Sequence, residues 1–313
     1  MAKIFLTGVT GFLGSNIARN LIKDGHSVIA TYRKASSKSS CRDFESKIHW
    51  VLQEGEKWMK TIKEYQPEIV IHCAWIGVSH ADRDCWKTQY KNVDYLNLIL
   101  SIAKKSNSSS VVVLGSQAEY GVIEGCINED HALMPTEAYG CIKVICSEIV
   151  KQFCNYNNIQ WYWLRLFSFF GKGEASNWLI PTLVTKILTS EHMDLTPGEQ
   201  KYAYLYVDDL AYAINNVIKH YNNASGVYNI SGSKAIKLKD IIQKVTSHIN
   251  PSFQLNFGKL PYRTNQPMHL QGDSKKFIKI FGEFEKSDFD NSLYQTILHL
   301  RNSYNNKTNN ESI

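Results

Sequence analysis

The chain has 313 residues, of which 43% are hydrophobic and 20% charged, a globular composition that excludes disordered, collagen-like and disulfide-scaffold proteins. It carries 35 Lys and Arg residues against 29 Asp and Glu, and this excess, a net charge of +6, is spread along the chain. A nucleic-acid-binding face requires clustered basic residues, so we expect no nucleic-acid partner.

No segment suggests a membrane-bound or exported protein. No apolar run approaches the roughly 18 residues that a membrane span requires. The N-terminal segment Met1–Gly8 breaks after a short apolar run and has no cleavage site. The seven cysteines, an odd number, include no C-x-x-C pair. The sequence therefore predicts a soluble cytoplasmic protein with reduced thiols, no membrane partner and no metal site.

The first half of the chain alternates short apolar runs with amphipathic stretches. Leu13, Ile17 and Leu21 recur every four residues, which predicts one face of a helix. The other predicted elements are helices over Asn92–Ala103 and Ala138–Phe153 and strands over Lys3–Thr7, Val28–Tyr32, Glu68–His72 and Ser110–Leu114. Such alternation implies right-handed crossovers and an α/β fold with a doubly wound parallel Rossmann sheet.

After Phe167 the alternation of predicted strands and helices becomes less regular. The predicted elements there are Leu179–Leu188 (helix), Lys201–Tyr206 (strand), Asp208–Tyr221 (helix), Gly226–Ile230 (strand) and Leu238–Ile249 (helix). We expect a Rossmann domain over residues 1–168, with 202–230 returning to it. A smaller C-terminal lobe would take 169–201 and 231–303. Asn, Ser and Lys dominate beyond His299 and predict a disordered tail over 304–313.

A glycine-rich stretch joins the first predicted strand to the first predicted helix. It reads Thr7-Gly8-Val9-Thr10-Gly11-Phe12-Leu13-Gly14. Glycines let the backbone turn tightly and approach a pyrophosphate, whose charge then lies at the helix N-terminus. The strand before it and the helix after it are the context that such a motif requires, so we expect a dinucleotide cofactor.

The end of the second predicted strand bears on the choice of dinucleotide. An NAD site places an acidic residue there to bind the ribose 2′-hydroxyl. This strand ends Tyr32-Arg33-Lys34, with no acid before Asp43. A guanidinium can pair with a 2′-phosphate, so Arg33, helped by Lys34, favours NADP(H). The alternative is a solvated basic loop.

Three residues form a candidate catalytic group. Tyr139 and Lys143 are four residues apart, a spacing that places both side chains on one helix face. An ammonium close to a phenol favours the phenolate and lowers the tyrosine pKa towards a useful acid–base range. Ser116 ends a predicted strand, where open α/β sheets bind ligands.

The ordered motifs resemble extended short-chain dehydrogenases/reductases, in the NAD-dependent epimerase/dehydratase family that acts on nucleotide sugars. The likeness runs from residue 3 to about residue 282. Besides Thr7–Gly14, it rests on Val70-Ile71-His72-Cys73-Ala74, Asn92-Val93, Ser116, Tyr120-Gly121, Glu129-Asp130, Pro135, Tyr139-Gly140, Lys143, Tyr206-Val207-Asp208-Asp209, Tyr228-Asn229-Ile230-Ser231-Gly232 and Pro261-Tyr262-Arg263.

The resemblance implies a role for each of these residues. Ser116, Tyr139 and Lys143 would be catalytic: Tyr139 exchanges a proton with the sugar oxygen, Ser116 holds that oxygen, and Lys143 binds the nicotinamide ribose. The expected cofactor contacts are Thr7, Gly8, Thr10, Gly11, Phe12, Leu13, Gly14, Tyr32, Arg33, Lys34, Cys73, Ala74, Trp75, Asn92, Tyr139 and Lys143. The expected substrate contacts are Ser116, Gln117, Asn177, Leu179, Ile180 and Arg263. The Rossmann domain would accordingly bind NADP, and the smaller lobe the nucleotide-sugar substrate. Relatives often dimerise, so the resemblance also implies a homodimer.

Departures from the family pattern narrow the activity. Gln117-Ala118 follows Ser116, where 4,6-dehydratases carry Asp-Glu and 3,5-epimerase-reductases a Cys, so neither reaction is expected. Tyr202 stands where relatives carry a phosphate-binding Arg. Trp75 replaces a small residue, and either narrows the sugar pocket or only packs.

The expected function is NADPH-dependent reduction of a nucleotide-linked 4-keto-6-deoxyhexose, which the resemblance connects with surface polysaccharide synthesis. A nucleotide-sugar 4-epimerase using NAD(P) is the alternative. A non-catalytic NADP-binding regulator is a third possibility, against which the three intact catalytic residues count.

Overall fold

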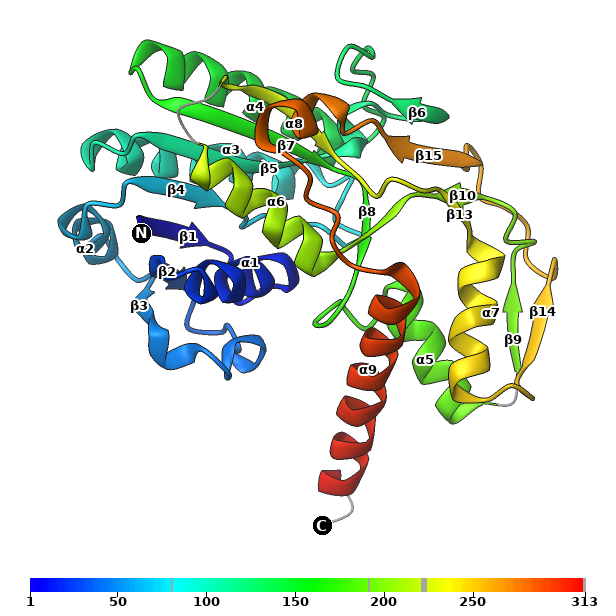
Figure 1. Cartoon of the computed structure of the whole chain (residues 1–313). Helices are drawn as coiled ribbons and strands as arrows, with labels where there is room; N and C mark the ends of the chain where they lie inside the picture. The colour runs from blue at the N-terminus through cyan, green and yellow to red at the C-terminus, as the bar shows by residue number, and fades with distance from the viewer. Residues whose placement is uncertain (80, 191, 221–223, 312–313) are drawn as a thin grey trace.

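A computed structural model describes residues 1–79, 81–190, 192–220 and 224–311. Seven parallel strands form the main sheet in the order β3-β2-β1-β4-β5-β7-β12 (Figure 1). Their bounds are β1 Lys3–Thr7, β2 Ser27–Tyr32, β3 Ile48–Leu52, β4 Ile69–His72, β5 Ser110–Ser116, β7 Gln160–Leu166 and β12 Gly226–Ile230. The strand order reverses between β1 and β4, and such a reversal is where open α/β sheets bind ligands.

Helices cover both faces of this sheet. The helices on one face are α1 (Phe12–Lys23), α6 (Val207–Lys219) and α8 (Lys275–Phe281), and those on the other are α2 (Lys57–Tyr65), α3 (Trp86–Lys105) and α4 (Ala138–Tyr156). Successive strand residues point to opposite faces, so Phe5 packs in the core under α3 and α4 while Leu6 packs under α1 and α6. A sheet buried on both faces explains why its strands are almost continuously apolar.

The remaining elements build a smaller lobe beside the sheet (Figure 1). Its helices are α5 (Leu179–Thr189), α7 (Leu238–Ile249) and α9 (Phe289–Glu311). Its strands are β13 (Ile236–Lys237), β10 (Lys201–Tyr202), β15 (His269–Gly272) and β6 (Gly125–Ile127) in one sheet, β11 (Tyr204–Tyr206) with β8 (Ser168–Phe170), and β14 (Gln254–Phe257) with β9 (His192–Leu195). Short 3-10 helices are η1 (Ser39–Cys41), η2 (Glu45–Lys47) and η3 (Gln117–Glu119).

The predicted fold class is confirmed: the sheet is parallel and doubly wound. The single strand expected over residues 201–206 is instead two strands in different sheets, because β10 pairs with β13 and β15 whereas β11 pairs with β8. Tyr202, Tyr204 and Tyr206 show the two-residue period of a strand, but this period does not indicate which strands the segment pairs with. The boundaries proposed for the two lobes stay a prediction.

The chain beyond residue 303 also differs from expectation. We expected disorder there, but α9 continues to Glu311. The helix begins in the lobe core, where Leu293 and Ile297 are buried, and an established helix propagates at little cost. The composition of the last residues does not indicate that they continue a helix that starts at Phe289. Residues 312–313, and Tyr221 at the end of the helix expected over 208–221, lie outside the described residues.

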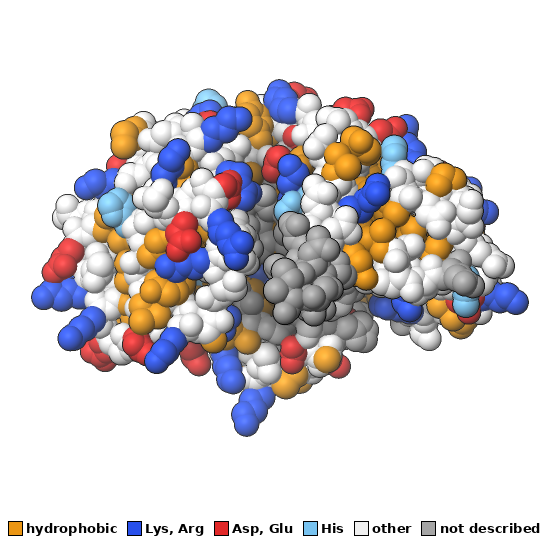
Figure 2. All heavy atoms as spheres, turned by 90° about the horizontal axis from the view of Figure 1, so that it is seen from below, with side chains coloured by type: hydrophobic (Ala, Val, Ile, Leu, Met, Phe, Trp, Pro, Cys, Tyr) orange, Lys and Arg blue, Asp and Glu red, His pale blue; other side chains and the backbone are white. Residues whose placement is uncertain are grey.

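Charge is dispersed over the molecule. On the face seen in Figure 2, Lys and Arg side chains lie scattered among acidic and apolar ones. No described helix is long and apolar enough to cross a bilayer. Across the described ranges, no group of three or more His, Cys, Asp and Glu residues is placed to hold a metal ion, and all seven cysteines are free.

Candidate active site

The glycine-rich loop brings the ends of β1 and β4 into close contact. Gly8 has a φ of +75°, and a Cβ built on it would lie 2.7 Å from the backbone nitrogen of Ala74. A Cβ on Gly14 would lie 2.1 Å from the carbonyl oxygen of Gly8. Helix α1 starts with no side-chain cap at Gly11, which leaves backbone N–H groups at its N-terminus for an anion. This narrow, positively polarised loop fits a dinucleotide pyrophosphate.

Below this loop, two buried side chains fix the end of β4. The Thr7 hydroxyl lies 2.8 Å from Nδ1 of His72 and accepts a hydrogen bond from the Ala74 N–H at 3.3 Å. Burial lowers the pKa of His72 to about 3, so its ring is neutral. Thr7 and His72 therefore hold the loop in place rather than contact a charged ligand.

The basic segment after β2 is open to a ligand. The side chains of Arg33 and Lys34 are exposed, and among the described residues neither forms an ion pair. The first acid downstream, Asp43, is already bound to Arg19, with Oδ2 2.7 Å from Nε. Tyr32 packs edge-on against Trp50, with ring centroids 5.7 Å apart. The cation that lies over these two rings is Lys38, with Nζ 4.3 Å and 4.4 Å from their centroids. Arg33 and Lys34 follow β2 directly, at the position where a carboxylate would define an NAD site.

The three candidate catalytic residues come together at the end of β5 and the start of α4. Ser116, Tyr139 and Lys143 are 8%, 8% and 3% exposed. The Ser116 side chain lowers the pKa of Tyr139. Burial nevertheless raises the pKa of Tyr139 above its ordinary value. The lowered pKa that we expected for Tyr139 is therefore not found, because the effect of burial is larger.

Lys143 is also buried, among close contacts. Its Nζ donates a hydrogen bond to the carbonyl oxygen of Leu114 at 2.6 Å and lies 3.4 Å from the centre of the Trp75 ring. Desolvation lowers the pKa of Lys143 to about 7. The ammonium is thus held by a carbonyl and an aromatic face, while burial opposes its charge.

Trp75 packs on the catalytic residues. Its ring meets that of Tyr139 edge-on, with centroids 5.9 Å apart, and its Nε1 donates to Gln89 Oε1 at 3.0 Å. Gln89, which the sequence analysis missed, also donates to the carbonyl oxygen of Gly77 at 2.7 Å. Buried Asn92 bonds both backbone groups of Ile76. The Asn92 amide thus holds the loop that carries Trp75, and the cofactor contact that we expected of Asn92 stays a prediction.

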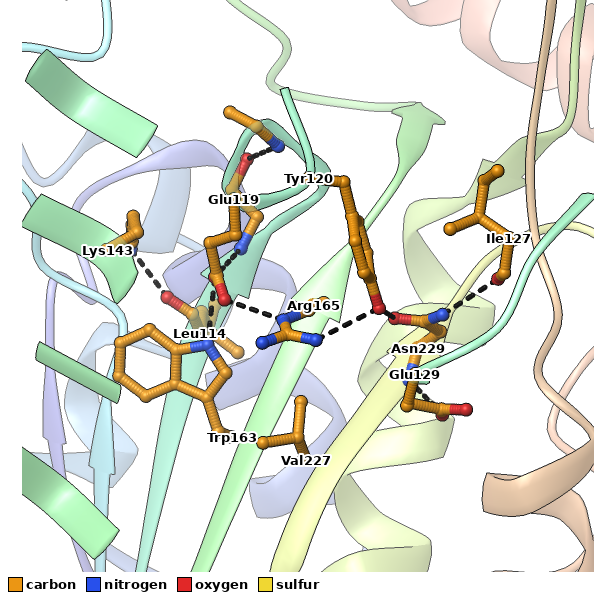
Figure 3. Close-up of polar contacts among 12 residues, drawn as sticks. Leu114, Glu119, Tyr120, Ile127, Glu129, Lys143, Trp163, Arg165, Val227 and Asn229 are labelled. Atoms are coloured by element: carbon orange, nitrogen blue, oxygen red, sulfur yellow. Dashed lines mark hydrogen bonds and ion pairs between the residues drawn. The ribbon is translucent and has the colours of Figure 1, made fainter. Parts of the chain in front are cut away.

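A buried ionic network around Glu119 and Arg165 (Figure 3) holds the backbone N–H of Ser116. Glu119, fully buried, accepts hydrogen bonds from Ser116 N at 2.8 Å, Trp163 Nε1 at 2.9 Å and Arg165 Nε at 2.6 Å. Arg165 also donates to the Tyr120 hydroxyl at 3.0 Å. The sequence motifs did not single out Glu119. Two of its partners, Trp163 and Arg165, lie 44 and 46 residues further along the chain, so only the folded sheet brings them to Glu119.

A hollow of about 170 Å³ lies next to Gln117. The remaining lining residues are Arg83, Ala118, Gly121, Val122, Thr136, Glu137, Asn265 and Pro267. Arg263, exposed, lies two residues before Asn265 on the same loop, and its charge lowers the pKa of Tyr202, which burial raises. Arg263 therefore lies near Tyr202, the residue that stands where the family pattern has a phosphate-binding Arg.

The segment before α5 approaches the glycine-rich loop. Trp178 packs edge-on against Phe12 of α1, with ring centroids 6.1 Å apart. Asn177 is exposed and Leu179 half-buried, so both can face a ligand. The Ile180 side chain is 2% exposed within the lobe core. The substrate contacts expected of these three residues stay predictions.

Comparison with known proteins supplies the family. The model of the NAD dependent epimerase/dehydratase family matches residues 4–231. The chain belongs to this family. The resemblance found in the sequence motifs is confirmed, since residues 4–231 include the glycine-rich loop, the candidate catalytic residues and the Tyr206–Asp209 motif. The family fold accounts for the topology of the sheet around the site.

Curated members of this family resemble the chain over most of its length. The dTDP-6-deoxy-L-talose 4-dehydrogenase (NAD(+)) of Aggregatibacter actinomycetemcomitans is 24% identical, covering 86% of this chain and 98% of that one. The CDP-abequose synthase of Salmonella muenchen is 25% identical, covering 89% and 91%. Among solved structures, the UDP-N-acetylglucosamine 4-epimerase of Methanobrevibacter ruminantium has a TM-score of 0.85 at 19% identity, covering 96% and 99%. That structural likeness shows the shared fold.

Proposed function

We propose that this enzyme reduces the 4-keto group of a nucleotide-linked 6-deoxyhexose with NADPH and so makes an activated deoxysugar. The observation that carries the proposal is the pair of unpaired cations, Arg33 and Lys34, at the end of β2. A reductase that consumes NADPH requires such a phosphate site, whereas a carboxylate there would repel the 2′-phosphate. Relatives named as a CDP-abequose synthase and a dTDP-4-dehydro-6-deoxyglucose reductase support the substrate class.

The geometry suggests how the chain's own groups act. The narrow turn at Gly8 and Gly14 and the uncapped N-terminus of α1 would hold the pyrophosphate, and Arg33 the 2′-phosphate. When bound, NADPH supplies the hydride that reduces the sugar carbonyl carbon. Tyr139 donates its hydroxyl proton to the carbonyl oxygen, which Ser116 orients through its own hydroxyl. The hollow beside Gln117 takes the sugar.

The rival proposal is a nucleotide-sugar 4-epimerase. It is supported by the similarity to a UDP-glucose 4-epimerase from Lactobacillus helveticus, 22% identical over 302 residues. An epimerase reoxidises its cofactor within each cycle and consumes none. The absence of an acid after β2 favours the reductase. Surface polysaccharide synthesis, as the use of the product, belongs to the same proposal and rests on the family resemblance.

The proposal is tested by following NADPH and NADH absorbance while purified protein is offered dTDP-, CDP- and GDP-linked 4-keto-6-deoxyhexoses. We expect one of these sugars to be reduced with stoichiometric loss of NADPH. Interconversion of UDP-hexoses at constant cofactor concentration would instead establish the epimerase. Cofactor binding without turnover of any of these sugars would contradict both enzymic proposals.

Arg33→Ala should raise the KM for NADPH by about tenfold or more, because a charge-assisted hydrogen bond is worth roughly 1.5–3 kcal/mol. The KM for NADH, which has no 2′-phosphate, should change little. The comparison is made by steady-state kinetics with both cofactors. Lys60→Ala, which removes a charge from the exposed face of α2, is the control and should alter neither value. Equal changes for the two cofactors in Arg33→Ala would contradict the NADP(H) assignment.

A further inference from the structure

The loop between β4 and α3 docks on the first turn of α4. The carbonyl oxygen of Arg83 accepts the Tyr139 N–H at 2.8 Å, and Asp84 Oδ1 accepts the Ala138 N–H at 3.0 Å. Glu137, the N-cap residue of α4, makes no side-chain cap of its own. Residues 83 and 84 therefore take over the capping of the helix that carries the candidate proton donor, and their position relative to Tyr139 is fixed by its backbone.

This docking places the Arg83 side chain on the face of the Tyr139 ring. The guanidinium carbon lies 4.2 Å from the ring centroid. On its other side, Nε of Arg83 donates to Glu137 Oε2 at 2.7 Å. The Arg83 side chain is 27% exposed and lines the hollow beside Gln117. A cation is thus held between a surface carboxylate and the phenol, at the entrance to the proposed sugar site.

The charged groups facing Tyr139 come from four segments. Arg83 from the loop after β4 favours the phenolate, whereas Glu119 of η3 and Glu137 before α4 oppose it. Lys143 lies one turn further along α4, with Nζ 5.7 Å from the ring centroid. Ser116, at the end of β5, contributes a hydrogen bond without charge. Two cations could therefore act on the phenol, and they differ in how firmly they keep their charge.

The two cations near Tyr139 are held differently. Burial lowers the pKa of Lys143 to about 7, and its Nζ is bonded to the carbonyl oxygen of Leu114. Arg83 is partly exposed, lies on the face of the phenol ring and is paired with Glu137. A guanidinium stays protonated throughout the accessible range. Arg83 is consequently a cation that keeps its charge beside Tyr139 when the proton leaves.

We propose that Arg83 is a positioning residue that stabilises the Tyr139 phenolate, with Glu137 holding and moderating its charge. This inference rests on the proposed reduction, in which the Tyr139 O–H bond breaks and its proton bonds to the carbonyl oxygen. The hydride of NADPH meanwhile provides the electron pair that forms the new C–H bond. The alkoxide oxygen is neutralised, and the negative charge passes to Tyr139, against which Arg83 lies.

The test measures the ionisation of Tyr139 directly in full-length protein carrying 3-fluorotyrosine. Fluorine lowers the pKa of a phenol, which keeps the titration within the range where the protein stays folded. The ¹⁹F NMR signal of Tyr139 is assigned as the one that Tyr139→Phe removes. We expect Arg83→Gln to raise the pKa of residue 139 by about one unit, the lower end for loss of a neighbouring opposite charge. Glu137→Gln should lower it.

The pair of variants separates electrostatics from structure. Both break the same Arg83–Glu137 ion pair, so a purely structural role would move the pKa in the same direction in both. Lys151→Gln removes an exposed charge from α4, 12 residues or about 18 Å along the helix, and should leave the pKa unchanged. Shifts of equal sign in Arg83→Gln and Glu137→Gln, or no shift in Arg83→Gln, would overturn the proposal.

The outcome is independent of the proposed activity. If the opposite shifts occur but no 4-keto sugar is reduced, the reductase proposal fails and the assignment of Arg83 stands. If NADPH is consumed but the ¹⁹F titration is unmoved, the assignment of Arg83 fails alone. Where a substrate is found, the pH limb of kcat/KM that reports Tyr139 should shift in the same direction as the NMR titration in each variant.

Discussion

Tyr139→Phe should lower the kcat of the proposed reduction by about 10²–10⁴, the usual size of a general-acid contribution. The substitution removes only the hydroxyl, whose pKa Ser116 lowers. The ring keeps its edge contact with Trp75 and its face contact with Arg83. Because those contacts do not involve the hydroxyl, we expect NADPH affinity and the free energy of unfolding to change little. Steady-state kinetics, cofactor titration and urea unfolding measure the three quantities separately.

A comparison with Ser116→Ala sharpens this prediction. In the proposed reduction Ser116 orients the sugar oxygen but gives up no proton, so its loss should reduce kcat less than the loss of the Tyr139 hydroxyl. Ser116 lowers the pKa of Tyr139, so the effects of the two substitutions should not add in the double variant. Full turnover by Tyr139→Phe would remove Tyr139 from proton transfer, and a large fall in cofactor affinity would point to a binding role instead.

The parts of the site that the sequence predicted are those with a local signal. The glycine-rich loop, the basic end of β2 and the Tyr139–Lys143 spacing each lie within one strand, turn or helix. Their meaning depends on backbone geometry that a few neighbouring residues determine. The structure adds the reason for two glycines: Gly8 has a positive φ, and Gly14 leaves no room for a Cβ.

The parts that the sequence analysis missed depend on contacts between distant segments. Arg83 meets Tyr139 across 56 positions of sequence, through a loop that Gln89 and Asn92 fasten to α3. No spacing rule connects a loop arginine with a helix tyrosine. The state of Lys143 was missed for a related reason, since its low pKa follows from burial under Trp75 and next to Leu114. Burial of this kind is a property of the assembled core.

Glu119→Gln should reduce the free energy of unfolding by about 3–5 kcal/mol, the cost of breaking a buried ion pair by removing one partner. The Glu119 and Arg165 side chains are 0% and 5% exposed, with their atoms 2.6 Å apart. The Gln amide oxygen can still accept the hydrogen bonds from Ser116 N and Trp163 Nε1, which both end on Oε1 of Glu119, but it leaves the Arg165 guanidinium buried without a counter-charge. Because the same side chain bonds the Ser116 N–H, disturbing it should displace Ser116, and we expect activity in the proposed reduction to fall in the fraction that remains folded.

The control for Glu119→Gln is Glu148→Gln, which breaks the exposed Glu148–Lys151 pair on α4. Exposed pairs are worth at most about 1 kcal/mol, so this variant should unfold at nearly the wild-type urea concentration. Adding Arg165→Met to Glu119→Gln removes the uncompensated charge and should recover part of the lost stability. If Glu119→Gln cost no more than Glu148→Gln, or if Arg165→Met deepened the loss, an uncompensated buried charge would not explain how this network stabilises the fold.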